Sequence, residues 1–308
     1  MSSPAVSIVV PCYNSAASLP LLVQRLEPVL AGAASEYELL LVNDASRDRT
    51  WEVITDLAAR YPWIRGICLM RNFGQHNTLL CGIRQAKFPI VVTLDDDLQN
   101  PPEEIPLLLA KLEEGYDVVY GTPARQQHGL WRNLASQITK LLLQKAMGSA
   151  AARSISAFRV FRTPLRDAFD TYRNPLVSID VLLTWGTTRF AVCTVKHDPR
   201  TIGKSNYTLR KLVVHALNMV TGFSTLPLQL ASWTGFAFTL LGLGLMTYVV
   251  LQALINGRQV AGFAFLASTI SLFAGVQLFA LGIFGEYLAR IHLRTMERPS
   301  YVLRTTTG

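Results

Sequence analysis

The sequence is short of charged residues and of cysteine. Only 16% of the 308 residues are charged and the mean hydropathy is +0.27, which is too apolar for an ordinary soluble enzyme of this length. The four cysteines stand singly among apolar neighbours with no Cys-x-x-Cys pair, so we expect reduced, buried thiols and neither a disulfide framework nor a zinc site. The five histidines are equally scattered. The shortage of charge indicates association with a membrane.

Two further signals are missing. No basic segment followed by an apolar stretch opens the chain, because Met1 to Ala5 leads directly into a short predicted strand; we therefore expect the N-terminal part to stay in the cytosol. No nucleic-acid motif accompanies the net charge of +8, so we expect no nucleic acid partner. Basic residues beside anionic lipid headgroups account for that charge.

Two long apolar runs account for the high hydropathy. Leu228 to Ile255 and Val260 to Gly285 carry no charged residue, and each exceeds the ~20 residues that a helix needs to cross a bilayer. Four residues, Asn256 to Gln259, separate them. The sequence therefore predicts a transmembrane helical hairpin over residues 226–287, with spans at about 228–255 and 260–285. The alternative is a pair of buried helices in a soluble core, which seldom run so long without a polar stripe.

The basic residues around the two runs predict their orientation. Four precede the first span, four follow the second, and the connecting loop holds only Arg258. By the positive-inside rule both ends of the hairpin are cytoplasmic, and residues 288–308 form a cytoplasmic tail. Residues 207–225 are apolar with basic residues interspersed, which predicts an interfacial amphipathic helix, with a plain core helix as the alternative. The basic residues counted before and after the spans are Arg200, Lys204, Arg210, Lys211, Arg290, Arg294, Arg298 and Arg304.

The first 120 residues alternate short apolar runs with longer amphipathic stretches. This alternation predicts an α/β fold with a mostly parallel sheet covered on both faces. From Gly121 to about Arg200 the pattern loosens into a helix-prone segment (130–147), an arginine-rich stretch (153–166) and a strand (190–195). No Gly/Ser/Pro-rich linker divides the two parts, so residues 1–206 are expected to form one cytoplasmic domain. The predicted elements are 6–11, 37–42, 64–70, 90–94 and 117–120 as strands, and 19–30, 50–60, 77–86 and 103–114 as helices.

An acidic turn follows the strand at residues 90–94. Three adjacent carboxylates, Asp95, Asp96 and Asp97, precede Asn100 and a Pro-Pro pair. In an open α/β sheet ligands lie at this edge, and neighbouring like charges repel unless a cation lies between them. Oxygen ligands from Asp95, Asp97 and the Gln99 amide suit Mg²⁺ or Mn²⁺, which in turn suits a pyrophosphate-bearing substrate. The alternative is a solvated acidic loop.

Polar residues also follow the first two predicted strands. Asp44 follows the second strand, where its carboxylate can accept a hydrogen bond from a base or ribose of a nucleotide, and Pro11 to Asn14 would form the facing wall. The alternative is local, because Asn43 to Ser46 also fits an ordinary turn or helix cap before Asp48 and Thr50. Three polar loops at one sheet edge predict one site.

Five motifs along the chain resemble one enzyme family. The chain is similar to the inverting GT-A glycosyltransferases that charge a polyprenyl phosphate: dolichol-phosphate mannose synthases, bactoprenol glucosyltransferases and undecaprenyl-phosphate 4-deoxy-4-formamido-L-arabinose transferases. The Gln-His pair before Asn77 is most similar to the formamido-arabinose branch. The likeness extends over nearly the whole chain, including both spans. The motifs are Pro11-Cys-Tyr-Asn14, Asn43-Asp-Ala-Ser46, Arg71-Asn-Phe-Gly-Gln-His76, Asp95-Asp-Asp-Leu-Gln-Asn-Pro-Pro-Glu103 and Arg200-x-x-Gly-x-Ser-x-Tyr207.

The resemblance implies a site for a nucleotide-sugar, expected to be a UDP-sugar, and for undecaprenyl phosphate. It implies Mg²⁺ or Mn²⁺ held by Asp95, Asp97 and Gln99, a homo-oligomer, with a tetramer expected from the family, and a multi-pass location in the bacterial inner membrane. The product would be a lipid-linked monosaccharide for cell-envelope glycan or lipid A modification. Donor contacts are assigned to Pro11, Tyr13, Asn14, Asp44, Arg71, Gln75 and Asp96.

Cations must hold the anionic acceptor, since two anions have to approach each other. Guanidinium groups match phosphate oxygens bidentately, and the alternative for such residues is anchoring at the membrane surface. Asp95, Asp97, Arg125 and Arg132 are the predicted catalytic residues. The predicted acceptor-phosphate residues are Arg125, Arg132, Ser136, Arg159, Arg200, Lys204 and Ser205.

The chain departs from the family pattern at several positions. Ser15 stands where these enzymes usually carry Glu, Asn43 and Ala45 stand within a segment that is often Asp-Asp-Gly-Ser, and Asn206 replaces a usual Lys. Ser154 to Ser156 replaces an Asp often found before the Phe-Arg pair. These changes favour an alternative, a catalytically silent nucleotide-binding membrane scaffold, against which the intact acidic turn weighs. A processive polysaccharide synthase is disfavoured, because its Gln-x-x-Arg-Trp-type helix and additional spans are missing.

Overall fold

The computed structural model describes residues 3–123, 155–198, 225–256 and 262–307. These residues fall into two compact units, one formed by Met1–Ala216 together with Glu297–Gly308, the other by Leu217–Met296. The C-terminal segment thus belongs to the first unit, although a long helical unit separates it from the rest in sequence.

The first unit is built on an eight-stranded sheet of the order β7-β5-β6-β4-β1-β2-β3-β8. β1 pairs in parallel with β2 and β4, β2 with β3, and β5 with β7, whereas β6 and β8 run antiparallel to their neighbours. The expected α/β fold with a mostly parallel sheet is therefore confirmed. The strands are β1 (Ala5–Cys12), β2 (Glu36–Asn43), β3 (Ile64–Leu69), β4 (Ile90–Thr93), β5 (Val118–Pro123), β6 (Arg159–Arg162), β7 (Phe190–Val195) and β8 (Leu303–Thr306).

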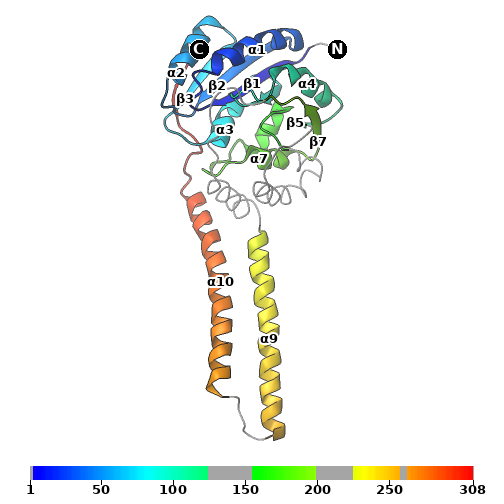
Figure 1. Ribbon diagram of the computed structural model, residues 1–308, viewed down its shortest axis with the longest axis vertical. Coiled ribbons are helices and arrows are strands. Elements are labelled where there is room, and N and C mark those ends of the chain that lie inside the picture. The colour runs from blue at the N-terminus through cyan, green and yellow to red at the C-terminus, as the bar shows by residue number, and fades with distance from the viewer. Residues whose placement is uncertain (1–2, 124–154, 199–224, 257–261, 308) are drawn as a thin grey trace. The chain divides into compact units, whose positions relative to one another are not determined.

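Helices cover both faces of this sheet (Figure 1). The connections between β1, β2, β3 and β4 each contain one helix, as parallel pairing requires. The helices of this unit in the described residues are α1 (Leu19–Ala33), α2 (Thr50–Arg60), α3 (Gln75–Gln85), α4 (Ile105–Glu113) and α7 (Ile179–Gly186), with 3₁₀ turns η1 (Pro102–Glu104) and η2 (Thr163–Phe169).

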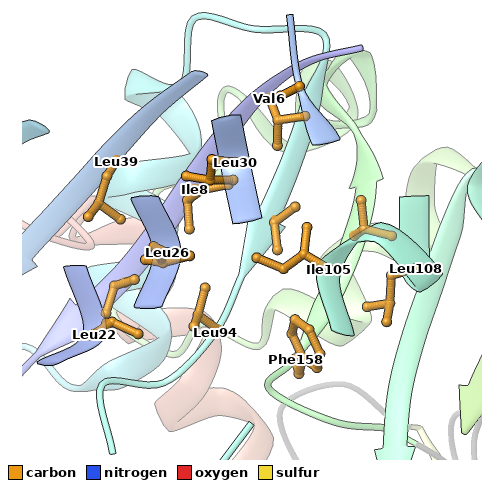
Figure 2. Packing of buried hydrophobic residues seen from close by; sticks show 14 of the residues in the cluster. Val6, Ile8, Leu22, Leu26, Leu30, Leu39, Leu94, Ile105, Leu108 and Phe158 are labelled. Atoms are coloured by element: carbon orange, nitrogen blue, oxygen red, sulfur yellow. The ribbon is translucent and has the colours of Figure 1, made fainter. Parts of the chain in front are cut away.

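Alternate residues of the central strands face the two helical layers. Figure 2 shows Val6 and Ile8 of β1 beside Leu26 and Leu30 of α1, with Ile105 across the same core. The opposite face of the sheet packs on α3, where Gly82 lies so close to Val9 that a Cβ at this position would come within 2.3 Å of its Cγ1. The central strands are therefore buried on both sides, which explains their continuous runs of apolar residues.

Two parts of the sheet were not predicted. The first is β6, which lies in the arginine-rich stretch and inserts antiparallel between β4 and β5. Helix α7, which follows η2, was not expected either. Residues 288–308 were expected to form a tail only. Instead α10 (Phe263–Thr295) continues through Thr295, and β8 pairs with β3. The helix expected at 130–147 and the interfacial helix at 207–225 lie outside the described residues, apart from the last residue of the latter.

The second unit contains α9 (Leu226–Asn256) and α10. Two stretches are long and apolar enough to cross a membrane, Pro227–Gln252 with mean hydropathy 1.8 and Leu272–Thr295 with 1.6. Gly242 lets the two helices approach, because a Cβ there would lie 3.1 Å from Phe273, which also makes an edge-to-face contact with Phe238. Gly242 therefore permits close packing of the two helices within the hairpin.

All four cysteines are free, as expected. Cys12, Cys68 and Cys81 are buried and Cys193 is half-buried. Burial raises the pKa of the Cys12 thiol well above its usual value and that of Cys81 to about 12, so these thiols are unreactive packing groups.

Candidate active site at the carboxyl edge of the sheet

Four loops leave the sheet at the carboxyl ends of β1 to β4. We call residues 13–18 the first loop, 44–49 the second loop, 70–74 the third loop and 94–101 the acidic loop. β1 lies between β2 and β4 with all three strands parallel, Cys12 opposite Asn43 and Val9 opposite Thr93. The register therefore brings the first, second and acidic loops to one edge, as the sequence predicted.

The acidic loop is anchored at both ends. Leu94 is buried, and its N–H donates to Val9 in β1. Leu98 has a positive φ of 60°, and Asn100 and the two prolines that follow are buried. The carboxylate of Asp97 accepts the backbone N–H of Gln99 at 3.1 Å. The loop thus holds three adjacent carboxylates on a folded turn rather than on a freely solvated segment.

The carboxylates of this loop are held in surroundings that disfavour their negative charge. Burial, and then the neighbouring Asp97 and Asp96 carboxylates, raise the pKa of Asp95 to about 7. Burial and Asp97 also raise the pKa of Asp96 to about 6, against a hydrogen bond from Ser15 that lowers it. Like charges held together in this way are stabilised by a cation or by protonation.

The residues present fit a magnesium-type ion. Among the described residues, no three His, Cys, Asp or Glu side chains gather into a metal-binding group, so in this part of the chain one or two loop carboxylates would bind an ion together with amide or water oxygens. Mg²⁺ is commonly bound in this way, through one or two carboxylates and the phosphates of a substrate. Asp95, Asp97 and Gln99 share the loop that was predicted to hold the ion, and their role as ligands stays a prediction.

The first and second loops are joined by their own polar groups. The Asn14 N–H donates to Ser46 Oγ at 3.0 Å, and Asn14 Oδ1 accepts the Arg47 N–H at 2.9 Å. Asn43 accepts hydrogen bonds from the Ser46 N–H and hydroxyl. Asn14 and Ala45 both have positive φ, 56° and 50°. The local alternative was thus partly right, because Asn43 and Ser46 form a turn and the Asp48 carboxylate accepts the Thr50 N–H at the start of α2.

Asp44 is bound to the third loop. Its two carboxylate oxygens accept the backbone N–H groups of Phe73 at 2.7 Å and Gly74 at 2.9 Å. Burial raises the pKa of Asp44, and these two bonds oppose the rise. Arg71 lies over the Phe73 ring, 4.4 Å from its centre, and its charge also acts on Asp44. The structure therefore gives Asp44 a role that the sequence did not reveal, holding the loop that carries Arg71.

The third loop leads into α3, whose first residues approach the acidic loop. Gln75 Nε2 donates to Asp95 Oδ1 at 2.7 Å. His76 Nδ1 accepts the N–H of Ile179, the first residue of α7, at 3.3 Å. Gln75 was among the predicted donor residues, whereas His76 was noted only as part of a motif. Nothing in the local sequence indicated its contact with α7, which lies 103 positions along the chain.

Arg159 is placed differently from the expectation. It was predicted to bind the acceptor phosphate, but it is only 2% exposed. Its guanidinium donates to the Asp180 carboxylate and, at 3.1 Å, to the Thr93 hydroxyl at the end of β4. The Tyr120 hydroxyl donates to the same Asp180 oxygen at 3.0 Å. In this arrangement the Arg159 guanidinium is buried and bonded to Asp180 and Thr93 at the base of the acidic loop. The Asp180 and Tyr120 partners were missed by sequence reasoning.

The remaining predicted residues divide into two groups. Pro11 lies in β1, Tyr13 is exposed on the first loop, and Asp96 faces that loop, so all three lie at the expected edge. The other acceptor residues lie outside the described part of the chain: Arg125, Arg132, Ser136, Arg200, Lys204 and Ser205.

Comparison with known proteins agrees with this architecture. The sequence profile described as glycosyl transferase family 2 matches residues 7–170. Undecaprenyl-phosphate 4-deoxy-4-formamido-L-arabinose transferase from Yersinia enterocolitica serotype O:8 / biotype 1B is 35% identical over 307 residues, covering 98% of this chain and 94% of the relative. The enzyme of that name from Yersinia pestis strain Pestoides F is 36% identical over the same shares.

A solved structure is similar in fold. Glucosyl-3-phosphoglycerate synthase from Mycobacterium tuberculosis, in complex with Mn²⁺, UDP-glucose and phosphoglyceric acid, superposes with a TM-score of 0.50 at 17% identity. The match covers 71% of this chain and 78% of that one.

Proposed function

Because this chain belongs to glycosyl transferase family 2, we propose that it transfers a sugar from a nucleotide-sugar to undecaprenyl phosphate and so forms a lipid-linked monosaccharide. The chain is a glycosyltransferase; the donor and the acceptor are the proposal. The observation that carries it is the meeting of the acidic loop with the Asp44-bound third loop at one sheet edge. The Yersinia relatives are named as undecaprenyl-phosphate transferases, which supports the choice of acceptor.

The donor is proposed to be a UDP-sugar that lies between the first, second and acidic loops. The exposed Tyr13 and the Asn14–Ser46–Arg47 contacts form one wall, and Asp44 with Arg71 forms the other. The Asp44 carboxylate accepts two backbone N–H groups and is also hydrogen-bonded by the Thr78 side chain. Because a carboxylate has about four acceptor positions, one would remain for the nucleotide.

The negative charge of the diphosphate would be neutralised by a divalent ion at the acidic loop. A bound Mg²⁺ or Mn²⁺ would supply Lewis-acid stabilisation of the negative charge that develops on the leaving nucleoside diphosphate. Asp95 and Asp97 would hold that ion with Gln99. Gln75 orients Asp95 by donating to its Oδ1, and the Gln99 N–H orients Asp97. Arg71 would add positive charge from the third loop.

The acceptor requires positioning more than activation. A phosphate monoester has a second pKa near ~6, so the attacking oxygen is largely ionised at neutral pH and needs no strong general base. Cations that hold two anions together would account for most of the rate. Arg125, Arg132, Ser136, Arg200, Lys204 and Ser205 remain the proposed acceptor residues, whereas Arg159 is engaged by Asp180.

The hairpin of α9 and α10 is proposed to span the bacterial inner membrane. Residues before and after it belong to the same folded unit, so a spanning hairpin begins and ends on the side of the membrane where that unit folds, proposed to be cytoplasmic. Assembly into a homo-oligomer stays a prediction from the family, as does the role of the product in the cell envelope or in lipid A modification.

Transfer in detergent tests the proposal. The full chain is incubated with undecaprenyl phosphate and a panel of radiolabelled UDP- and GDP-sugars, with Mn²⁺ or with chelator. We expect a metal-dependent lipid product from one UDP-sugar. Nucleotide binding with no product from any donor would instead support the silent scaffold, and a product that grows into a polymer would support a processive synthase.

A further inference from the structure

The first loop and the acidic loop are joined by one side-chain hydrogen bond. Ser15 Oγ donates to Asp96 Oδ2, although the two residues are 81 positions apart. Ser15 Oγ in turn accepts the Tyr13 N–H at 3.0 Å, and the backbone of Tyr13 also donates a hydrogen bond to Asp96. Ser15 is only 5% exposed, so its hydroxyl has little access to water and forms its hydrogen bonds with these two loops.

Ser15 is itself rigidly held. Its N–H donates to Thr50 Oγ1 at 2.7 Å, and that hydroxyl donates to Asp48 Oδ1 at 2.5 Å at the start of α2. The Ser15 carbonyl accepts the N–H groups of Ser18 and Leu19 at the start of α1. Because two helix starts converge on Ser15, its hydroxyl presents a fixed point to which the acidic loop can attach.

The three adjacent carboxylates are turned toward different partners. Asp96 is bound by Ser15 of the first loop, Asp95 by Gln75 of α3, and Asp97 by the N–H of Gln99 in its own loop. Separate partners prevent the three carboxylates from rotating freely against one another. Asp96 thus faces a different element from Asp95, beside which it stands in sequence.

We propose that Ser15 is a positioning residue which, through Asp96, sets the separation between the first loop and the acidic loop, between which the nucleoside diphosphate is proposed to bind. This inference rests on the proposed function for its ligand. It replaces the predicted donor contact of Asp96 with a structural connection. It also gives a positive role to Ser15, one of the departures from the family pattern: a glutamate there would set a fourth carboxylate against Asp96, whereas the serine donates to it.

Binding of UDP in the presence of Mn²⁺, measured by calorimetry on the full chain in detergent, tests the proposal. Ser15→Ala is expected to weaken binding about tenfold, as for loss of a hydrogen bond to a charged group, while Ser15→Thr, which keeps the hydroxyl, stays within about threefold of wild type. Asp96→Asn combined with Ser15→Ala is expected to cost no more than the larger single effect, because both remove one connection.

The matched control, Ser7, lies on β1, the strand that leads into the first loop. Ser7 is fully buried, and its hydroxyl donates to the Glu38 carboxylate at 2.7 Å, near the opposite end of β1. Ser7→Ala removes the same type of bond and is expected to lower thermal stability without changing UDP affinity. Unchanged UDP binding in Ser15→Ala, an equal loss in Ser7→Ala, or additive effects of the Ser15 and Asp96 substitutions would overturn the proposal.

A second measurement keeps this test separate from the proposed donor. Hydrogen exchange of the peptide that covers residues 94–101 needs no nucleotide, and it is expected to be faster in Ser15→Ala than in wild type or Ser7→Ala. If wild type binds no UDP, the proposed donor is wrong, and faster exchange still supports the connection between the loops. Unchanged exchange in Ser15→Ala contradicts that connection whatever the nucleotide.

Discussion

Gln75 Nε2 donates a 2.7 Å hydrogen bond to Oδ1 of Asp95, which joins the first turn of α3 to the acidic loop. Gln75 is exposed and contributes little to the core, whereas Asp95 is the carboxylate with the most perturbed environment of that loop. The bond therefore links the start of α3, directly after the third loop, to the proposed metal site. Because Gln75 is exposed, replacing it should change the position of Asp95 without changing the stability of the fold.

Gln75→Ala is expected to reduce sugar transfer about tenfold, because a side-chain bond to a charged group contributes roughly 1.5 kcal/mol or more. The Mn²⁺ concentration for half-maximal rate should rise, with little change in melting temperature. Gln85→Ala, at the other end of the same helix, is the control. Equal metal requirements for Gln75→Ala and wild type would show that Gln75 does not orient Asp95.

Asp97→Ala is expected to abolish transfer, by at least ~100-fold, while leaving the protein folded, because the residue is proposed to serve the metal rather than the core. Radiolabel transfer and circular dichroism measure the two effects. Asp56→Ala, which removes an exposed carboxylate from α2, should retain full activity. Near-normal transfer by Asp97→Ala would refute the metal assignment.

The metal-free protein should lose stability as the pH rises. The pKa of Asp95 is about 7 in the folded state and ~3.9 in an unfolded chain, so the folded state binds this proton more tightly. The resulting stabilisation is complete below about pH 4 and disappears as the pH rises through about 7. In chelator, the melting temperature of wild type should therefore fall relative to that of Asp95→Asn between pH 5 and pH 8. Parallel pH curves for the two proteins would be inconsistent with a raised Asp95 pKa.

Ala45→Gly is expected to stabilise the protein by about 0.5 kcal/mol. Ala45 has a φ of +50°, a region that costs a non-glycine residue ~1–2 kcal/mol, from which the extra entropy of an unfolded glycine subtracts ~0.4–1 kcal/mol. Ala58→Gly, in the interior of α2, should destabilise by about 1 kcal/mol. Denaturant unfolding compares the two variants, and a loss of stability in both would show that Ala45 is not strained.

Asp180→Ala is expected to destabilise the protein by roughly 3–5 kcal/mol, because it leaves the buried Arg159 charge without its partner. Arg159→Met combined with Asp180→Leu should be more stable than Asp180→Ala alone, since no buried charge is left unpaired. Tyr120→Phe removes only one hydrogen bond to Asp180 and should cost about 1 kcal/mol. A normal unfolding curve for Asp180→Ala together with a raised Michaelis constant for the lipid would contradict this structural role. It would instead support the prediction that Arg159 binds the acceptor phosphate.

The loops that form the candidate site could largely be predicted from the sequence. Apolar strand runs alternate with amphipathic helices, and such runs pair in parallel with one helix in each connection. The carboxyl ends of β1, β2 and β4 must then meet, which is why the first loop, Asp44 and the acidic loop were expected together. The two long apolar segments likewise predict helices, because their length and lack of charge are local properties.

The partners across the site were decided only by tertiary structure. β6 lies between β4 and β5, so Arg159 is buried against Thr93 and Asp180, and β8 follows the hairpin and pairs with β3. The Ser15–Asp96 and His76–Ile179 contacts join residues 81 and 103 positions apart. Local periodicity records which face of an element is apolar. It does not record which distant element meets that face, because such pairing depends on how the whole chain closes its core.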